Sequence, residues 1–84
     1  MNKIKLFGKV EHTSDIKFDI ARKLKAYITI QIRSTSEDAF NCIAYERMCE
    51  KLRNIKQGEY IYLEGYIIQN EEDKYIIIVD EMYF

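Results

Sequence analysis

One helix-like segment set between strand-like segments is the feature that most restricts the fold of this chain. Residues 40–45 are largely apolar and uncharged, which suits a strand with both faces covered. From residue 46 the period changes, and three apolar residues recur at helical spacing: Met48, Leu52 and Ile55. Gly58 stands where a helix commonly ends in a left-handed residue, and alternation then resumes with Ile61 and Leu63. The stretch predicts a strand, a short helix, a glycine stop and another strand.

A single helix, with no others to alternate with the strands, argues against a parallel α/β sheet and for a small closed β structure. Strand patterns cover residues 3–10, 26–33, 39–45, 59–68 and 75–84, and a short extended piece covers 16–20. Residues 11–15 look turn-like, and helical character over 19–25 is left open. Five strands with the helix between the third and fourth have the order of the oligonucleotide/oligosaccharide-binding (OB) barrel. We therefore predict an all-β fold with one helix, a five-stranded OB-fold barrel, as a single domain over 1–84.

Alternation also predicts which side chains fill the barrel. Gly8 falls on the inward side of the first strand, where it lets the strand bend as a small barrel requires. Seven apolar residues are expected to be core: Ile28, Ile30, Ile32, Met48, Leu52, Ile61 and Leu63. On the strand over 26–33 the opposite face presents an outward row of Tyr27, Thr29, Gln31 and Arg33.

The net charge of −1 hides an uneven distribution. Residues 1–33 hold eight basic and three acidic side chains, whereas residues 34–84 hold five basic and eleven acidic ones. This asymmetry is a reason to expect a polyanionic partner for the first third of the chain. The alternative is that both sets of charges are simply solvated.

Catalysis and metal binding are not expected. His12 is the only histidine, no pair of acids stands beside a nucleophile, and there is no glycine-rich phosphate loop. Cys42 and Cys49 are expected to be buried or partly buried thiols rather than a disulfide. Together with His12 they lack the fourth ligand and the pair spacing of a zinc site. We expect no metal and no other cofactor.

The chain also lacks the sequence features of export and membrane insertion. Lysines interrupt the apolar run of residues 1–10, and no apolar segment approaches the ~20 residues that a membrane helix needs. We therefore expect a cytoplasmic protein with no membrane partner.

Short motifs along nearly the whole chain resemble those of bacterial single-stranded DNA-binding (SSB) proteins or the related primosomal replication protein N. They lie in the same order and at similar spacing. They are residues 2–10 (NKIKLFGKV), 14–18 (SDIKF), 27–30 (YITI), 41–45 (NCIAY) and 56–65 (KQGEYIYLEG).

This resemblance implies a function and a site. In the family, bases stack on outward aromatic side chains, and lysines and arginines contact phosphates. The residues expected to bind nucleic acid are Lys3, Lys5, Lys25, Tyr27, Thr29, Arg33, Asn41, Tyr45 and Tyr66. Tyr60 and Tyr62 are expected at an oligomer interface, and Phe7 is left open between the two surfaces. For each tyrosine the alternative is cross-strand packing or an oligomer contact.

The chain also departs from the family pattern. It has no tryptophan, and the family's aromatic residue at the start of the third strand aligns with Ala39, leaving Phe40 one register off and facing inward. The loop over residues 69–74 is short and acidic, which would repel phosphate. Residues 80–84 resemble the family's acidic tail tip only superficially and are expected to belong to the last strand.

The function expected is sequence-tolerant binding of single-stranded DNA in replication, recombination or repair, with RNA left open as a ligand. The alternative is an OB-fold module that holds another replication or repair protein and binds no oligonucleotide. A homodimer or homotetramer is expected because so small a barrel with seven tyrosines leaves much apolar surface to cover.

Overall fold

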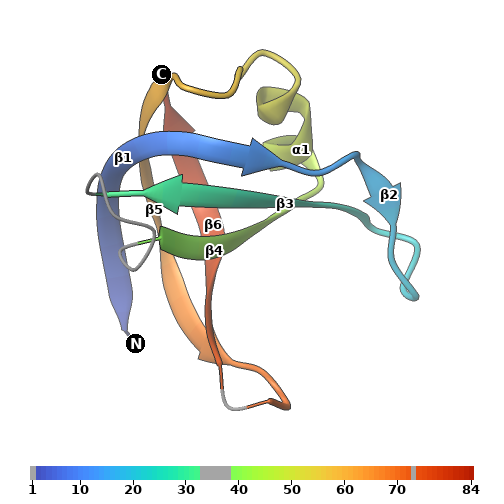
Figure 1. Ribbon diagram of the computed structural model, residues 1–84. Coiled ribbons are helices and arrows are strands. Elements are labelled where there is room, and N and C mark those ends of the chain that lie inside the picture. Colours follow the sequence, from blue (N-terminus) through green and yellow to red (C-terminus); the bar gives the residue numbers. More distant parts are fainter. Residues whose placement is uncertain (1, 33–38, 73) are drawn as a thin grey trace.

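Strand β1 bends sharply and takes part in both halves of a β-barrel (Figure 1). The computed structural model describes residues 2–32, 39–72 and 74–84. Its elements are β1 (Lys3–Thr13), β2 (Lys17–Phe18), β3 (Leu24–Gln31), β4 (Ala39–Tyr45), α1 (Arg47–Leu52), β5 (Tyr60–Gln69) and β6 (Tyr75–Tyr83). The predicted order of five main strands with one helix before the last two is confirmed, with the two-residue β2 as an addition.

The sheet runs in the order β1-β5-β6-β4-β3-β2, and pairing of β1 with β3 closes it into a barrel. Residues 3–9 of β1 pair with β5, and residues 9–13 pair with β3. All ladders are antiparallel except the contact of β4 with β6, which is parallel and pairs only Cys42 with Ile77 and Ile43 with Ile78. The barrel is therefore mixed.

Close packing explains the glycine in the bent strand. Gly8 is buried, and a Cβ atom placed on it would lie 2.5 Å from Cγ2 of Ile30 and 2.8 Å from the carbonyl oxygen of Gln31. Only a residue without a side chain lets β1 approach β3 this closely. The predicted inward position of Gly8 is confirmed.

Side chains from every main strand fill the barrel, and the helix and the turn after it add Met48, Cys49, Leu52 and Ile55. Six of the seven predicted core residues are buried: Ile28, Ile30, Met48, Leu52, Ile61 and Leu63. The prediction for Ile32 is wrong. Its side chain is 42% exposed, because β3 ends at Gln31 and the alternation that buries Ile28 and Ile30 ends with it. Both cysteines are buried free thiols, as predicted.

Phe40 shows where the barrel opens. It pairs with the buried Ile30, which places it on the inward face, yet it stays 38% exposed. The reason is that β6 pairs with β4 only from Cys42 onwards, so none of the described strands lies on the other side of β4 at this end.

Three boundaries differ from the sequence-based prediction. Residues 11–13 continue β1 through an irregularity between Val10 and His12 rather than forming a turn. The helix ends at Leu52, so Gly58 does not cap it; the glycine has the expected positive φ of 94° but lies in a later turn, where its N–H donates to the carbonyl of Val10 at 2.8 Å. Residues 19–25 form a turn followed by the start of β3, not a helix.

The ends of the last two strands agree with prediction. Residues 80–83 belong to β6, as expected for the segment that resembles an acidic tail. The turn between β5 and β6 is organised by Asn70, whose side-chain oxygen accepts from the N–H groups of Glu72 at 2.9 Å and Lys74 at 3.0 Å. Among the described residues, no helix has the length and apolar character to cross a membrane. That same part of the chain contains no group of three or more potential metal-ligating side chains.

Candidate nucleic-acid interface

Five of the predicted binding residues lie on the outer face of two neighbouring strands, β3 and β4. The register places Lys25 opposite Tyr45 and Thr29 opposite Asn41, with Tyr27 between them opposite Ile43. Alternation along both strands turns these side chains away from the buried Ala26, Ile28, Cys42 and Ala44. We call the set Lys25, Tyr27, Thr29, Asn41 and Tyr45 the β3–β4 face.

A lysine between two tyrosines dominates the electrostatics of this face. Nζ of Lys25 lies 5.2 Å from the ring centre of Tyr27 and 5.8 Å from that of Tyr45, both within the range of a cation–π contact. The hydrogen bond with the Tyr27 side chain is the largest effect and raises the pKa of Lys25. Burial, the second-largest effect, lowers it, and smaller charge interactions with Tyr27, Tyr45 and Asp19 raise it. The ammonium therefore stays positive in the physiological range, beside two rings that can stack on bases.

The β3–β4 face is polar at the end formed by Thr29 and Asn41. The hydroxyl of Thr29 donates to the side-chain oxygen of Asn41 at 3.4 Å. Tyr27 is 48% exposed, whereas Tyr45 is half-buried at the end of β4. The arrangement offers one open ring, one partly covered ring, an amide, a hydroxyl and a cation within two strands.

Two isoleucines, Ile43 and Ile78, form an apolar floor between this face and Tyr66 on β5. Ile43 of β4 lies beside Ile78 of β6, and Ile78 pairs with Tyr66. The side chains of Ile43 and Ile78 point outward by register but are only 5% and 8% exposed. Sequence reasoning did not single out these isoleucines for the site, although alternation already placed Ile43 on the same side as Asn41 and Tyr45. Tyr66 thus lies on the same surface as the β3–β4 face.

The two predicted lysines of β1 lie beyond Tyr66 and beside acidic residues. Lys3 pairs with Tyr66 in register, and its Nζ lies 3.8 Å from a carboxylate oxygen of Glu64 and 3.8 Å from one of Asp80. Lys5 lies directly opposite Glu64. Carboxylates therefore offset part of the charge of Lys3, and Lys5 has one as its register partner. Arg33, also predicted to bind, lies outside the described residues.

The tyrosines predicted at an oligomer interface lie at the start of β5, before Glu64 and Tyr66. The ring of Phe7 on β1 stacks on that of Tyr60, with ring centres 5.7 Å apart and planes at 16°. The ring of Tyr62 lies 5.8 Å from that of Tyr83 on β6. We call Phe7, Tyr60, Tyr62 and Tyr83 the aromatic cluster; Phe7 and Tyr60 are 61% and 60% exposed. The structure places Phe7 with this cluster and not with the β3–β4 face.

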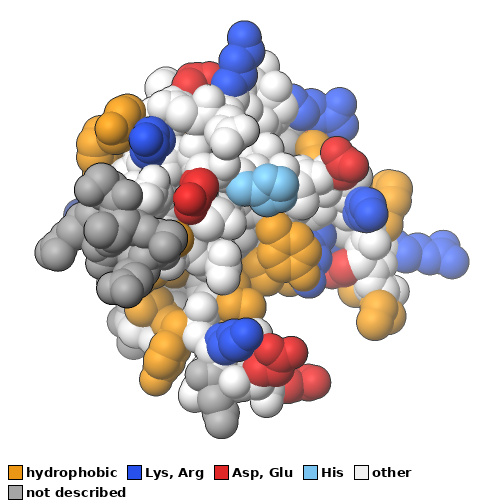
Figure 2. Space-filling model, viewed as in Figure 1, with side chains coloured by type: hydrophobic (Ala, Val, Ile, Leu, Met, Phe, Trp, Pro, Cys, Tyr) orange, Lys and Arg blue, Asp and Glu red, His pale blue; other side chains and the backbone are white. Residues whose placement is uncertain are grey.

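Figure 2 shows hydrophobic side chains exposed next to the single histidine, and a notch between them and the arm of residues 14–23 that projects from the barrel in Figure 1. Lysine and arginine side chains border the arm on this side of the molecule. The surface beside the β3–β4 face is therefore both hollowed and partly basic.

No protein-family model matches the chain, and no curated protein matches its sequence. Its fold is nevertheless similar to several solved structures over nearly its whole length. The SSB domain of a Synechococcus protein has a TM-score of 0.85 and 16% identity and covers 100% of this chain and 96% of its own. PriB from Ralstonia solanacearum has a TM-score of 0.82 and 10% identity, covering 99% and 96%. The mitochondrial single-stranded DNA-binding protein Rim1 from S. cerevisiae has a TM-score of 0.84 and 9% identity, covering 99% and 94%.

These similarities confirm the predicted OB-type fold, a five-stranded mixed barrel with one short helix between β4 and β5. They also confirm that SSB domains and PriB are structural neighbours of the chain, as the sequence motifs suggested. At 9–16% identity they establish the fold alone.

Proposed function

We propose that the β3–β4 face binds single-stranded DNA with little sequence preference, in replication, recombination or repair. The observation that carries the proposal is the position of Lys25, whose ammonium lies within 6 Å of two tyrosine rings on an outward sheet surface. A base stacked on an exposed ring contributes about 1–3 kcal/mol, and every base has a face that can stack. The fold shared with SSB domains and PriB supports the same assignment.

The path of the strand follows from the surface. Bases stack on Tyr27 and Tyr45, the amide and hydroxyl of Asn41 and Thr29 contact the backbone or base edges, and the apolar floor leads the strand towards Tyr66. Lys25 contacts a phosphate once a base displaces it from the rings. We propose no catalytic step, because binding by stacking and charge requires none.

The protein is further proposed to assemble as a homodimer or homotetramer through the aromatic cluster. Stacked and exposed Phe7 and Tyr60 support this, since contiguous exposed aromatic surface commonly marks a protein contact. The cluster lies on β1, β5 and β6, so assembly leaves the β3–β4 face accessible.

The experiment is a titration of fluorescently labelled dT20, oligo-U20 and a matched 20-base-pair duplex, followed by anisotropy over a range of salt concentrations. We expect tighter binding to the single strands than to duplex, because rings on a sheet cannot read a major groove. About 2–4 phosphate contacts predict a slope of log K against log [salt] of roughly −1.5 to −3. Equal affinity for duplex, or a flat salt response, would favour the alternative of a protein-interaction module.

A further inference from the structure

The only histidine of the chain, His12, lies beside the β3–β4 face on a third strand, β1. The register pairs it with Thr29, which is itself paired with Asn41. Residues paired across neighbouring strands point to the same side of a sheet, so His12 faces outward with these two. Its side chain is exposed. The polar row of Asn41 and Thr29 therefore continues onto β1 and ends at an imidazole.

An irregularity in β1 turns His12 to this side of the sheet. Val10 is fully buried and pairs with Ile30. His12 comes two residues later but pairs with Thr29, the residue adjacent to Ile30. Regular alternation would point Val10 and His12 to the same side, into the barrel. The extra residue, Glu11, reverses the alternation, as a β-bulge does when it re-aims a side chain, and bulges are over-represented next to functional sites.

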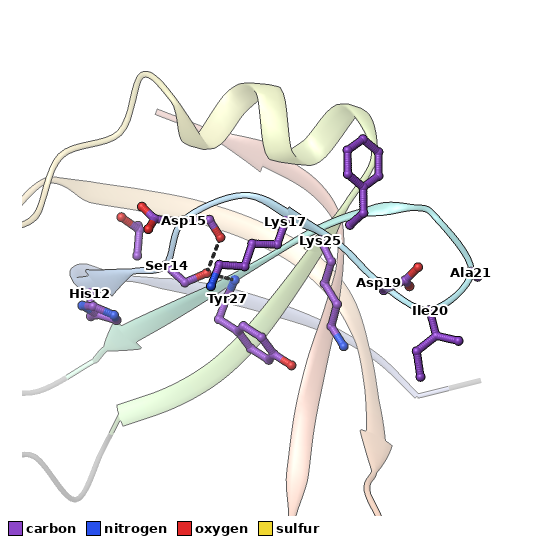
Figure 3. A pocket seen from close by; sticks show the side chains of 11 residues that line it. His12, Ser14, Asp15, Lys17, Asp19, Ile20, Ala21, Lys25 and Tyr27 are labelled. Atoms are coloured by element: carbon purple, nitrogen blue, oxygen red, sulfur yellow. Dashed lines mark hydrogen bonds between the residues drawn. The ribbon is translucent and has the colours of Figure 1, made fainter.

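The imidazole of His12 has no partner in the part of the chain that the structure describes. It forms neither a hydrogen bond nor an ion pair there. Figure 3 shows it on one side of Tyr27 and the side chain of Lys25 on the other. The register agrees, because Lys25 and Thr29 flank Tyr27 along β3. The open ring of Tyr27 therefore has a permanent cation on one side and an unengaged imidazole on the other.

Several charged or titratable side chains lie around His12. Among the described residues they are Lys9 and Glu11 on β1, Asp15, Lys17 and Asp19 on the arm, Lys25 and Tyr27 on β3, and Glu59 in the turn before β5. The carboxylates of Asp19 and Glu59 accept from the backbone N–H groups of Lys23 at 2.9 Å and Lys56 at 2.8 Å. Carboxylates, amines and phenols ordinarily change charge outside the range of about pH 5 to 8, whereas histidine changes within it. A pH change in this range therefore alters the charge of the surface at His12.

We propose that His12 is a further residue of the single-strand site and holds a phosphate when its ring is protonated. The strand then meets a cation at each end of its path across Tyr27 and Thr29, Lys25 at one end and His12 at the other. A phosphate beside the ring favours the charged form of the ring, because opposite charges at short distance stabilise each other. Binding therefore takes up a proton from solvent, and affinity rises as the pH falls. This inference rests on the proposed function, because His12 contacts the same strand.

The test measures the affinity for dT20 at about pH 5.5 and about pH 8, on either side of the range in which histidine titrates. Circular dichroism at both pH values shows that each protein is folded, and thymine is used because it does not titrate in this range. We expect the wild type to bind up to about fivefold more tightly at the lower pH, the factor that one phosphate contact gives at 0.1 M salt relative to 1 M. The slope of its log K against log [salt] should steepen by up to about 0.7.

Two substitutions at position 12 fix the charge of this residue. His12→Gln is neutral at both pH values and should remove the pH dependence of affinity and slope. His12→Lys is positive at both, so its affinity should not depend on pH and should exceed that of the wild type by up to about fivefold at about pH 8. The control Gln57→Lys adds the same charge in the exposed turn after the helix and should follow the wild type at both pH values.

The outcomes separate this inference from the proposed function. If the wild type binds dT20 and Tyr45→Ala weakens binding, but affinity does not depend on pH, His12 holds no phosphate and the proposed function stands. The same conclusion follows if His12→Gln keeps the pH dependence of the wild type. If Gln57→Lys tightens binding as much as His12→Lys, the effect is one of net charge and the inference is overturned. If the wild type binds no oligonucleotide at either pH, both fail.

Discussion

The ammonium of Lys25 lies over the ring of Tyr27, with Nζ 5.2 Å from the ring centre. A base that stacks on this side of the ring must displace the ammonium, which gives up a contact of about 0.5–1 kcal/mol at an exposed site. The same displacement makes the charge available to a phosphate. Lys25 therefore both covers the ring and supplies the cation that holds the backbone of the strand.

Replacing Lys25 with Met separates these two roles, because the side chain keeps most of its length and loses its charge. We expect the slope of log K against log [salt] for dT20 to become shallower by roughly 0.7, the value for one phosphate on a single strand. At 1 M salt, where the phosphate contact contributes little, binding should be as tight as in the wild type or tighter, since the ring is uncovered. An unchanged slope would mean that Lys25 serves only to pack against the rings.

Assembly through the aromatic cluster is tested by Tyr62→Arg. The hydroxyl of Tyr62 donates to Glu64 at 3.1 Å, and its ring lies beside that of Tyr83. An arginine at position 62 can therefore pair with the Glu64 carboxylate and lie beside the Tyr83 ring within the same protomer. We expect the variant to be folded but monomeric by multi-angle light scattering at tens of micromolar. Tyr75→Arg is the control, because Tyr75 is 71% exposed at the far end of β6. A wild-type monomer, or dissociation by Tyr75→Arg alone, would contradict this use of the cluster.

Gly65 is predicted to tolerate no side chain. A Cβ atom on it would run into the carbonyl oxygen of Ile78, at the irregularity where β5 pairs with β6. Because the obstructing atom is backbone, it cannot move aside as a side chain would, and we expect Gly65→Ala to lower the free energy of unfolding by at least about 1–3 kcal/mol. Urea unfolding followed by circular dichroism measures this.

Gly58 provides the comparison for that substitution. It has a positive φ of 94° but open space around its Cα. Gly58→Ala should therefore cost only backbone strain, of order 1 kcal/mol. Wild-type stability in Gly65→Ala would show that β5 and β6 can separate at this point without cost.

Most of the fold could be predicted from local patterns. The period change at residue 46 located the helix, and alternation located the strands, because both signals are carried by residues a few positions apart. The errors occur where the sequence pattern typical of a strand or helix continues beyond the residue at which that strand or helix ends. Ile32 continues the alternation of β3 beyond the last paired residue, and Gly58 has the dihedral angle of a helix stop six residues after the helix has ended.

The candidate site was predictable only in part. Alternation identified Tyr27 and Thr29 as outward side chains, and the family resemblance added Asn41 and Tyr45. The register shows that the four are neighbours. The burial of Ile43 and Ile78, the acidic partners of Lys3 and the pairing of His12 with Thr29 depend on which distant strands lie side by side. That information is not contained in any short segment of the sequence.

The central claim is that the β3–β4 face, and not the aromatic cluster, binds the single strand. The most direct measurement is the affinity for dT20 of Tyr45→Ala and Tyr60→Ala, each shown by circular dichroism to be folded. We predict that Tyr45→Ala weakens binding by about 1–3 kcal/mol, the contribution of one base stacked on an aromatic ring, and that Tyr60→Ala leaves it unchanged. Loss of affinity in Tyr60→Ala, with wild-type affinity in Tyr45→Ala, would contradict the claim and place the binding surface on the other side of the barrel.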